Sequence, residues 1–279
     1  MFEKRFLISG LLVVLALAGL TPAAAEETSH LWPRFAVDAG AYNISTSDKI
    51  KVDGEIELIG REIDLATDIG LPDSEMLLTF KFDWAFAERH SLQFGYWSLD
   101  RSGSRSIARE IEIGDIVFPV GAEAEIEFDT TSIGAAYTYW FMRHQRFGVG
   151  GTFGLVYLGL DARASASVRL GPGSGSLSRE TSASTDLPVP MIGIAGKISP
   201  WERWVFYGRA EILPSITVGE YSGSAGNYSF GADFYVWGPL AVGASFDGTY
   251  YDAEIDQDDW NGSVDLSTNG FRFYLRAAF

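Results

Sequence analysis

The chain has 279 residues, including 19 Phe, 12 Tyr and 8 Trp, no Cys, and a formal net charge of −16. The absence of cysteine excludes disulfides, cysteine-ligated metal sites and a cysteine nucleophile. An apolar content of 47% excludes a disordered chain, and the negative charge argues against nucleic acid as a partner, because phosphates would be repelled.

The first 25 residues have the layout of a secretory signal peptide. Lys4 and Arg5 are basic, residues 6–20 are mostly apolar, and residues 23–25 are three alanines. An apolar run of about 15 residues is shorter than the roughly 20 needed to span a bilayer as a helix. We therefore expect residues 1–25 to be removed on export and residues 26–279 to form the mature protein.

From Trp32 onward, apolar residues recur at every second position, which is the period of a strand with one apolar face. In the last segment, Phe271 and Phe273 alternate with Arg272 and Tyr274. The chain shows no sustained helical period. The alternation predicts ten strands, at 34–44, 76–86, 91–100, 124–142, 147–168, 188–198, 204–216, 227–237, 241–253 and 264–279.

The connections between these strands are of two kinds. Those at 88–90, 143–146, 200–203 and 238–239 are short, whereas those at 45–75, 101–123, 169–187, 217–226 and 254–263 are long and rich in Gly, Ser and acidic residues. Short turns on one side and long loops on the other are typical of outer-membrane barrels, as is a ring of aromatic residues at one level. We expect such an interface girdle beside the short turns, formed by Trp84, Phe86, Trp140, Phe141, Trp201, Trp204 and Trp237.

These features predict an all-β fold, a ten-stranded antiparallel up-and-down transmembrane β-barrel with both termini in the periplasm and long extracellular loops. Over nearly all of the mature sequence the chain resembles the bacterial outer-membrane β-barrel superfamily. The closing strand is its most specific element, because Phe271, Phe273 and Phe279 are similar to the aromatic signal read by the barrel-assembly machinery. The resemblance implies a Gram-negative outer membrane, with its lipid, its lipopolysaccharide and that machinery as partners.

Ten charged residues, five of each sign, fall on the face opposite the apolar one. A closed ten-stranded sheet has a backbone radius of only about 10 Å, so buried ions must be paired. We expect a salt-bridged layer that largely occludes the lumen. The alternative is a selectivity belt in a narrow passive porin for small solutes, but equal numbers of both signs favour the plug. The residues are Asp38, Lys81, Asp83, Lys197, Arg209, Glu211, Asp233, Asp247, Arg272 and Arg276.

A catalytic site is not evident in the sequence. Outer-membrane enzymes that the chain resembles in size use a histidine near the outer rim. Here His30 precedes the predicted barrel, and His90 and His144 fall in predicted periplasmic turns. We therefore expect a non-enzymatic protein without a cofactor, and an outer-membrane enzyme is the second alternative.

Negative charge is concentrated in the predicted loops. Residues 45–75 carry −6, residues 100–129 carry −5 and residues 252–265 carry −6, which together equal the charge of −17 left after residues 1–25 are removed. Asp256, Asp258 and Asp259 are candidate ligands for a divalent cation, since Ca²⁺ and Mg²⁺ prefer carboxylate oxygens, but Trp260 breaks the calcium-loop spacing. We interpret the loops mainly as a solvated acidic surface, in a protein with a structural or surface-interaction role.

Overall fold

The computed structural model describes residues 30–53, 62–66, 70–106, 111–113, 116–118, 123–169, 176–218, 221–257 and 260–279. Within these ranges, no helix has the length and apolar character needed to cross a membrane. The predicted signal peptide, residues 1–25, lies outside the described residues.

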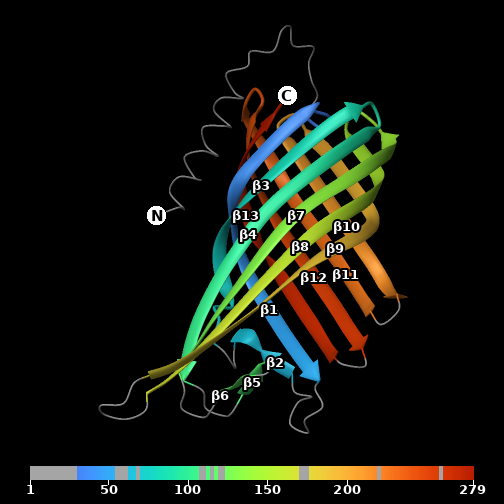
Figure 1. Cartoon of the computed structure of the whole chain (residues 1–279). Coiled ribbons are helices and arrows are strands. Elements are labelled where there is room, and N and C mark those ends of the chain that lie inside the picture. The colour runs from blue at the N-terminus through green and yellow to red at the C-terminus, as the bar shows by residue number, and fades with distance from the viewer. Residues whose placement is uncertain are drawn as a thin grey trace.

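The described chain consists almost entirely of strands. They are β1 (Phe35–Asp53), β2 (Glu62–Asp64), β3 (Ser74–Ala87), β4 (His90–Ser106), β5 (Ile111–Ile113), β6 (Ile116–Phe118), β7 (Glu123–Arg143), β8 (Phe147–Arg169), β9 (Ser176–Trp201), β10 (Trp204–Val218), β11 (Tyr221–Trp237), β12 (Leu240–Gln257) and β13 (Trp260–Ala278). Ten long strands pair antiparallel with their neighbours, and β13 pairs with β1 to close a barrel (Figure 1). The predicted ten-stranded antiparallel barrel is confirmed.

All ten predicted strands are present, and most extend further than predicted on the side of the long connections. β9 begins at Ser176, twelve residues earlier than predicted. The expected loops 217–226 and 254–263 were wrong, because β10 ends at Val218 and β11 begins at Tyr221, while β12 ends at Gln257 and β13 begins at Trp260. These extensions lack apolar periodicity, and their pairing with a neighbouring strand determines their conformation.

The four short connections lie at one end of the barrel, which we call the short-turn end; the opposite end is the loop end. Gly238, with a φ of 51°, allows the turn from β11 to β12. The two terminal strands also meet at the short-turn end, where the amides of Arg34 and Phe35 donate to the Phe279 carbonyl at 2.6 and 2.9 Å. The barrel is therefore closed at this end up to its last residue.

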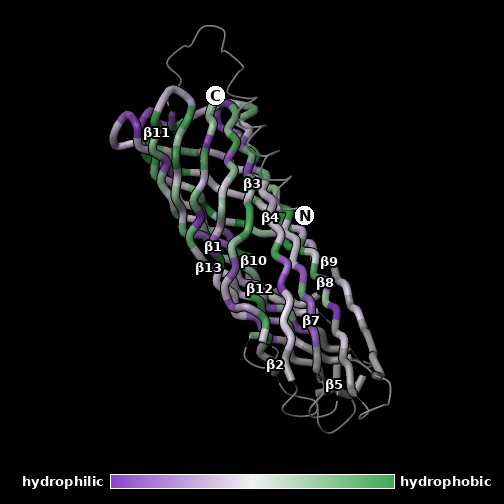
Figure 2. The backbone as a smooth tube through the Cα atoms, turned by 90° about the vertical axis from the view of Figure 1, so that its left-hand side faces the viewer, coloured by the Kyte–Doolittle hydropathy of each residue, from purple (hydrophilic) through white to green (hydrophobic). Residues whose placement is uncertain are grey.

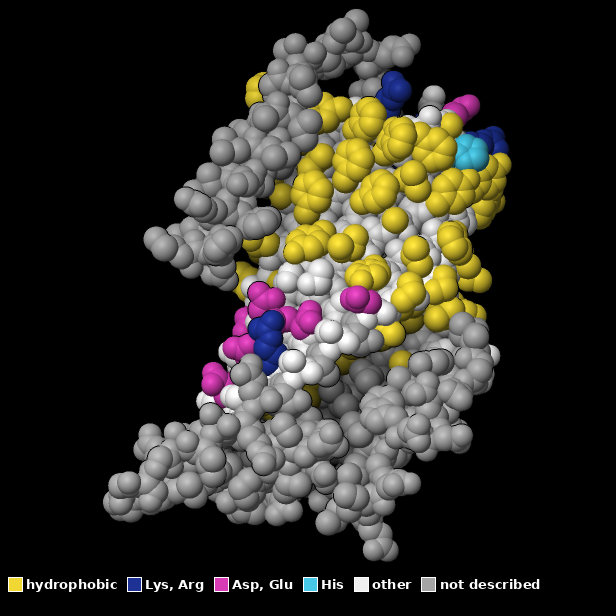
Figure 3. Space-filling view, in the orientation of Figure 1, with side chains coloured by type: hydrophobic (Ala, Val, Ile, Leu, Met, Phe, Trp, Pro, Cys, Tyr) yellow, Lys and Arg dark blue, Asp and Glu magenta, His cyan; other side chains and the backbone are white. Residues whose placement is uncertain are grey.

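The outer face of the barrel is apolar. Hydrophilic and hydrophobic residues alternate along the strands (Figure 2), and hydrophobic side chains cover the wall from the short-turn end toward mid-height, with charged side chains at both ends of this band (Figure 3). Exposed apolar residues two positions apart form the band, for example Phe153 and Leu155 on β8, or Phe271 and Phe273 on β13. This arrangement suits a wall surrounded by lipid.

Six of the seven predicted girdle residues are exposed near the short turns, and the most exposed are Trp237 at 80% and Trp201 at 64%. Trp140 is the exception and corrects the prediction, because it is only 8% exposed and its Nε1 donates to Ser91 Oγ at 3.0 Å. Its outward neighbours Tyr139 and Phe141 are exposed. Alternation along β7 therefore turns Trp140 inward.

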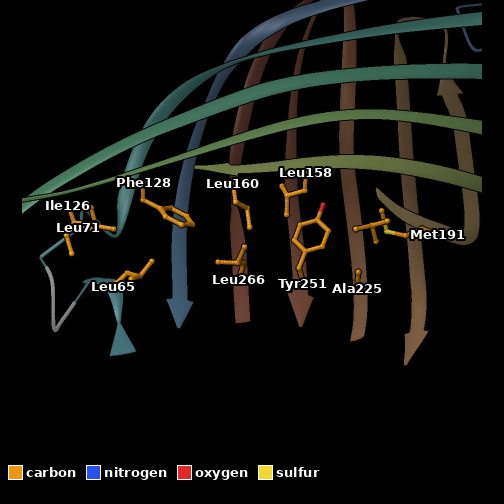
Figure 4. Close-up of a cluster of buried hydrophobic side chains, with 11 residues drawn as sticks. Leu65, Leu71, Ile126, Phe128, Leu158, Leu160, Met191, Ala225, Tyr251 and Leu266 are labelled. Carbon is orange, nitrogen blue, oxygen red and sulfur yellow. The ribbon is translucent and has the colours of Figure 1, made fainter. Parts of the chain in front are cut away.

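Toward the loop end the barrel splits into two facing sheets. The β3–β4 ladder ends at the pair Thr79–Trp97 and the β9–β10 ladder at Ile192–Ile212, while β4 and β9 continue to pair on their other sides. An apolar cluster fills the space between the sheets (Figure 4). Its buried members are Leu65, Leu71, Ile126, Phe128, Leu158, Leu160, Val189, Met191, Ala225, Tyr251 and Leu266.

The two places where the ladders stop differ. Beside β4, the backbone of Gly70 packs closely on Gly103. A Cβ added to Gly103 would lie 2.8 Å from the carbonyl oxygen of Gly70. Between β9 and β10, among the described residues, no backbone pair follows Ile192–Ile212. Pro188 and Pro190 lie on this edge of β9 while the β8 ladder continues through them, and neither has an N–H to donate. We call residues 187–191 and 213–218 the β9–β10 seam.

Candidate functional site in the barrel lumen

Arg276 holds together three strands besides its own. Its guanidinium lies 2.7 Å from Asp38 Oδ1 on β1, 2.9 Å from Asp83 Oδ2 on β3 and 3.5 Å from Asp233 Oδ2 on β11. The side chains of Asp38 and Asp233 are each only 4% exposed. One cation thus links carboxylates on both sides of the closing strand β13, inside the lumen.

A second arginine forms the next layer toward the loop end. Arg272 is 1% exposed, and its Nε donates to Asp247 Oδ2 at 3.1 Å and to Ser245 Oγ at 3.2 Å. Its guanidinium lies 4.0 Å from the ring centre of Tyr274. Lys81 Nζ lies 3.8 Å from the same Asp247 carboxylate. Two cations on β13 and β3 therefore share one anion on β12.

The segment preceding β1 folds into the short-turn end of the lumen. Leu31 is 1% exposed and packs in a cluster with Val205, Tyr235 and Ala241. Trp32 Nε1 donates to the carbonyl of His144 at 2.8 Å. Residues 30–32, which we call the N-terminal cap, thus cover the opening beneath the Arg276 layer.

Cations and aromatic rings hold the cap in place. The Lys197 ammonium lies 3.9 Å from the ring centre of Trp32 and 4.7 Å from that of Trp140. Arg143 lies 4.4 Å from the ring centre of Trp32 on the side of the turn. Such cation–π contacts strengthen when water is excluded. Lys197, which sequence reasoning placed in the charge layer, therefore binds the cap instead of a carboxylate.

His30 is the titratable group of the cap. Its ring stacks on Tyr235 with 3.9 Å between ring centres, and its carbonyl accepts a hydrogen bond from the Tyr235 hydroxyl at 3.2 Å. Burial, and secondarily the positive charge of Arg203, lower the pKa of the His30 imidazole below its ordinary value. The docked cap therefore favours neutral His30.

The arginine layers divide the lumen into two cavities. One of about 130 Å³ lies between the cap and the layers, and another of about 160 Å³, the middle cavity, lies toward the loop end. Five residues line both cavities and form the partition between them: Lys81, Gln93, Arg209, Ser229 and Arg272.

Glu211 on β10 lies in the wall of the middle cavity. It is 3% exposed, and Asn227 Nδ2 donates to its Oε2 at 3.1 Å. Arg209 Nη1 lies 3.8 Å from Oε1, beyond hydrogen-bond distance, and Arg209 Nη2 donates to Thr138 Oγ1 at 3.4 Å. Among the described residues, Glu211 Oε1 has no hydrogen-bond donor.

The structure places all ten charged residues of the predicted layer on the walls of these two cavities. Nine of them take part in ion pairs with one another, Lys197 being the exception described above. Arg276 and Asp38, both members of the predicted layer, are in direct contact.

A further buried ion pair, between Asp48 and Arg101, was missed from the sequence. Both side chains are 3% exposed, and Arg101 Nη1 also donates to Thr46 Oγ1 at 2.7 Å. Both residues fall in segments expected to be solvated loops, whereas they lie on the inner faces of β1 and β4. Continuing the strand alternation beyond the apolar band would have placed them inside. The N-terminal cap carried no comparable periodic signal.

The other predicted sites have these positions. Asp256 lies in β12, and Asp258 and Asp259 lie outside the described residues; among the described residues, no group of three or more His, Asp or Glu could hold a metal ion.

Phe271 and Phe273 are 59% and 61% exposed on the outer face of β13, and Phe279 pairs with Phe35 through its backbone. Their part in assembly stays a prediction.

Comparison with known proteins gives structural matches only. No protein-family model matches the sequence, and no curated protein matches it significantly. The outer-membrane protease OmpT from Escherichia coli is similar over 91% of this chain and 100% of its own, with 12% identity and a TM-score of 0.59. The Pseudomonas putida toluene transporter TodX covers 90% of this chain and 91% of its own at 9% identity, but its TM-score is 0.34.

The Yersinia pestis attachment protein Ail covers 85% of this chain and 97% of its own at 11% identity, with a TM-score of 0.28. At these identities the likeness concerns the fold alone, and of these three structures OmpT has the highest TM-score. The closed order of ten strands and the OmpT likeness agree: the chain has the fold of the bacterial outer-membrane β-barrel superfamily.

Proposed function

We propose that the protein is a non-enzymatic integral barrel of the Gram-negative outer membrane, with a lumen closed to ion flow and a structural or surface-interaction role. The observation that carries the proposal is the contact of Arg276 with Asp38, Asp83 and Asp233, which joins β13 to β1, β3 and β11 inside the lumen. An ion desolvated in so narrow a space persists only when it is paired and hydrogen-bonded. The paired layer is therefore a stable obstruction.

The N-terminal cap supports the same proposal by a second obstruction. An ion entering from the short-turn end would have to displace Trp32 from Lys197 and Trp140 before it reached the Arg276 layer. Two successive barriers of different chemistry, one aromatic and one ionic, favour a closed barrel over an open pore.

The positions of the histidines favour a non-enzymatic role. His30, His90 and His144 are the three histidines of the chain, and all lie at the short-turn end. In the proposed orientation this end faces the periplasm, away from the surface where substrates of outer-membrane enzymes arrive.

The loop end supports surface interaction. Asp252 and Asp265 are exposed and directly opposite each other on β12 and β13. Like charges in a cross-strand pair repel each other, so divalent cations that also bind lipopolysaccharide phosphates would relieve the repulsion. We include lipopolysaccharide, with bridging divalent cations, among the proposed partners, along with the barrel-assembly machinery.

Conductance in planar bilayers tests the closed lumen. We expect negligible steady conductance for the parent. The double variant Arg272→Ala, Arg276→Ala leaves three positive and five negative charges of the predicted layer, so we expect new conductance that favours cations. Arg163→Ala is the matched control, because Arg163 is an exposed arginine paired with Glu127 outside the lumen.

A narrow passive porin is the second candidate, and one observation favours it. The two cavities share five lining residues, so a small rearrangement of Lys81 and Arg209 would join them. Steady conductance of the parent protein would overturn the closed barrel and establish this candidate.

A further inference from the structure

Three glycines leave part of the wall of the middle cavity, which we call the glycine wall, without side chains. Gly95, Gly134 and Gly154 line it from the consecutive strands β4, β7 and β8. A Cβ added to Gly95 would meet no atom within 4 Å, and one added to Gly134 would meet only Val156 Cγ2, at 3.6 Å. The volume of about 160 Å³ is about ten times the 15 Å³ that a single water requires. The cavity can therefore accept a small organic molecule against the bare backbone of this wall.

A buried acceptor points into this space. Glu211 is 3% exposed, and its Oε2 accepts a hydrogen bond from Asn227. Its Oε1 has no hydrogen-bond donor among the described residues. The carboxylate lies over Gly154, where an added Cβ would be 3.4 to 3.5 Å from its atoms. Buried carboxylate oxygens normally accept hydrogen bonds, and an unsatisfied one is costly. The cavity thus presents an acceptor that a ligand donor would satisfy.

The charges around the cavity disfavour a cationic donor. Lys81, Arg209 and Arg272 line it with three positive charges, against the two negative charges of Glu211 and Asp247. A cationic ligand would add to this positive excess. A hydroxyl group donates to Glu211 without adding charge.

The remaining walls suit an aromatic ring. Trp97, Tyr42 and Tyr251 line the cavity opposite or beside the glycine wall, and Val156 adds an aliphatic surface. Tyr251 also belongs to the apolar cluster between the two sheets. A planar ring can lie on flat backbone and contact aromatic side chains at the same time.

The β9–β10 seam lies close to Glu211, which lines the cavity. Glu211 pairs with Gly193, and the next pair, Ile192–Ile212, is the last of the ladder. Beyond it, Val189 and Met191 on one strand and Leu213 on the other pack against the apolar cluster. The unpaired seam therefore begins at Leu213, two residues beyond Glu211, and is apolar on its inner side.

We propose that the middle cavity binds a small neutral aromatic molecule that carries a hydroxyl group, whose hydroxyl donates to Glu211 Oε1 and whose ring lies on the glycine wall beside Trp97. The molecule enters through the apolar β9–β10 seam. This binding is independent of whether the arginine layers conduct, so it can succeed or fail separately from the proposed closed lumen.

Phenol and anisole are the probes, because anisole keeps the ring and oxygen but lacks the donor. Titration calorimetry of the full protein in detergent, with empty micelles as the reference, should show saturable one-to-one binding of phenol and about tenfold or more weaker binding of anisole, as expected for a hydrogen bond to a charged group. Gly95→Leu fills the cavity and should abolish binding of both. Gly151→Leu is the matched control: an added Cβ there also meets nothing within 4 Å, but Gly151 shares the outer face with Phe153, so binding should be unchanged.

Glu211→Gln tests the acceptor. The Gln oxygen is needed by Asn227, so the amide NH₂ would face the cavity, and the preference for phenol over anisole should disappear. Gly134→Val is a second filling variant if Gly95→Leu does not fold, as judged by heat-modifiable gel mobility. Equal binding of phenol and anisole by the parent would overturn the role of Glu211. The site itself would be overturned if the parent bound no more phenol than empty micelles do. It would also be overturned if both filling variants still bound phenol.

Discussion

Arg276 Nη1 lies 2.7 Å from Asp38 Oδ1, and the two residues are direct partners in the ladder between β13 and β1, although 238 positions separate them in sequence. The shortest ion pair among the described residues of the charge layer therefore lies across the closing ladder. Closure of the barrel and formation of this ion pair are consequently one event, because neither residue meets the other until the last strand is in register.

Replacing Arg276 should destabilise the barrel strongly. Arg276→Ala leaves Asp38, Asp83 and Asp233 close together without their shared cation, and breaking one partner of a buried pair costs about 3–5 kcal/mol. Urea unfolding followed by gel mobility would measure the loss. Arg163→Ala removes an exposed pair and should cost about 0–1 kcal/mol. Equal losses in the two variants would show that the Arg276 cluster contributes no more than a surface pair.

Docking of the N-terminal cap should depend on pH. Because the pKa of the His30 imidazole is lowered by burial and by Arg203, the docked state resists protonation. Its contribution is fully present above the ordinary His value of about 6.5 and is lost as pH falls below that value. A spin label at Arg34→Cys, introduced into a chain that has no other cysteine, should become more mobile between about pH 7.5 and about pH 5.5.

The control for this prediction is His30→Gln, which cannot titrate in that range. Its label mobility should be independent of pH. If the label on the protein that keeps His30 also shows no change in mobility with pH, docking of the cap does not depend on the charge of His30.

Removing Phe279 should impair assembly more than its contact area suggests. Its carbonyl accepts from the amides of Arg34 and Phe35, and its own amide donates to Phe35 at 2.7 Å, so it fixes the end of the closing ladder. We expect the deletion variant to accumulate unfolded in the periplasm, measured by fractionation and heat-modifiable mobility. Phe279→Tyr keeps the ring and the backbone bonds and should assemble normally. Normal yield of the deletion variant would remove Phe279 from the proposed assembly signal.

The orientation of the barrel predicts where protease can cut. Trypsin added to intact cells should reach only the connections at the loop end, because the turn containing Arg146 lies at the short-turn end and faces the periplasm in the proposed orientation. Mass spectrometry of the fragments would identify the sites. Cleavage after Arg143 or Arg146 in sealed cells would reverse the orientation.

The strands could be predicted because their outer face carries a continuous band of exposed apolar side chains. Phe271 and Phe273 alternate with Arg272 and Tyr274, and such alternation fixes both the strand and the direction of each side chain. The contact of Arg276 with Asp38 followed from antiparallel closure of the first and last strands. Beyond the lipid-facing band this signal ends, so the full lengths of β9 and β12 and the buried pair Asp48–Arg101 were not predicted.

Trp140 shows how two signals can conflict. Its position beside a short turn suggested an interface girdle, whereas its position between Tyr139 and Phe141 in the alternation points inward, and alternation prevailed. The cap was not predictable in the same way, because His30 and Trp32 precede the first strand and are ordered by rings and cations from distant strands. The glycine wall of the middle cavity was not predictable either, because it depends on the pairing register of β4 and β7, which places Gly95 opposite Gly134.

Pro188 and Pro190 of the β9–β10 seam affect whether another chain can add a strand to this barrel. An unpaired strand edge is a template on which another chain can add a strand, the first step toward domain swapping or fibrils. Pro188 and Pro190 occupy alternate positions on that edge, so the two donors an incoming strand would need there do not exist. This part of the β9 edge is therefore unpaired with β10 and yet unsuited to strand addition by another chain.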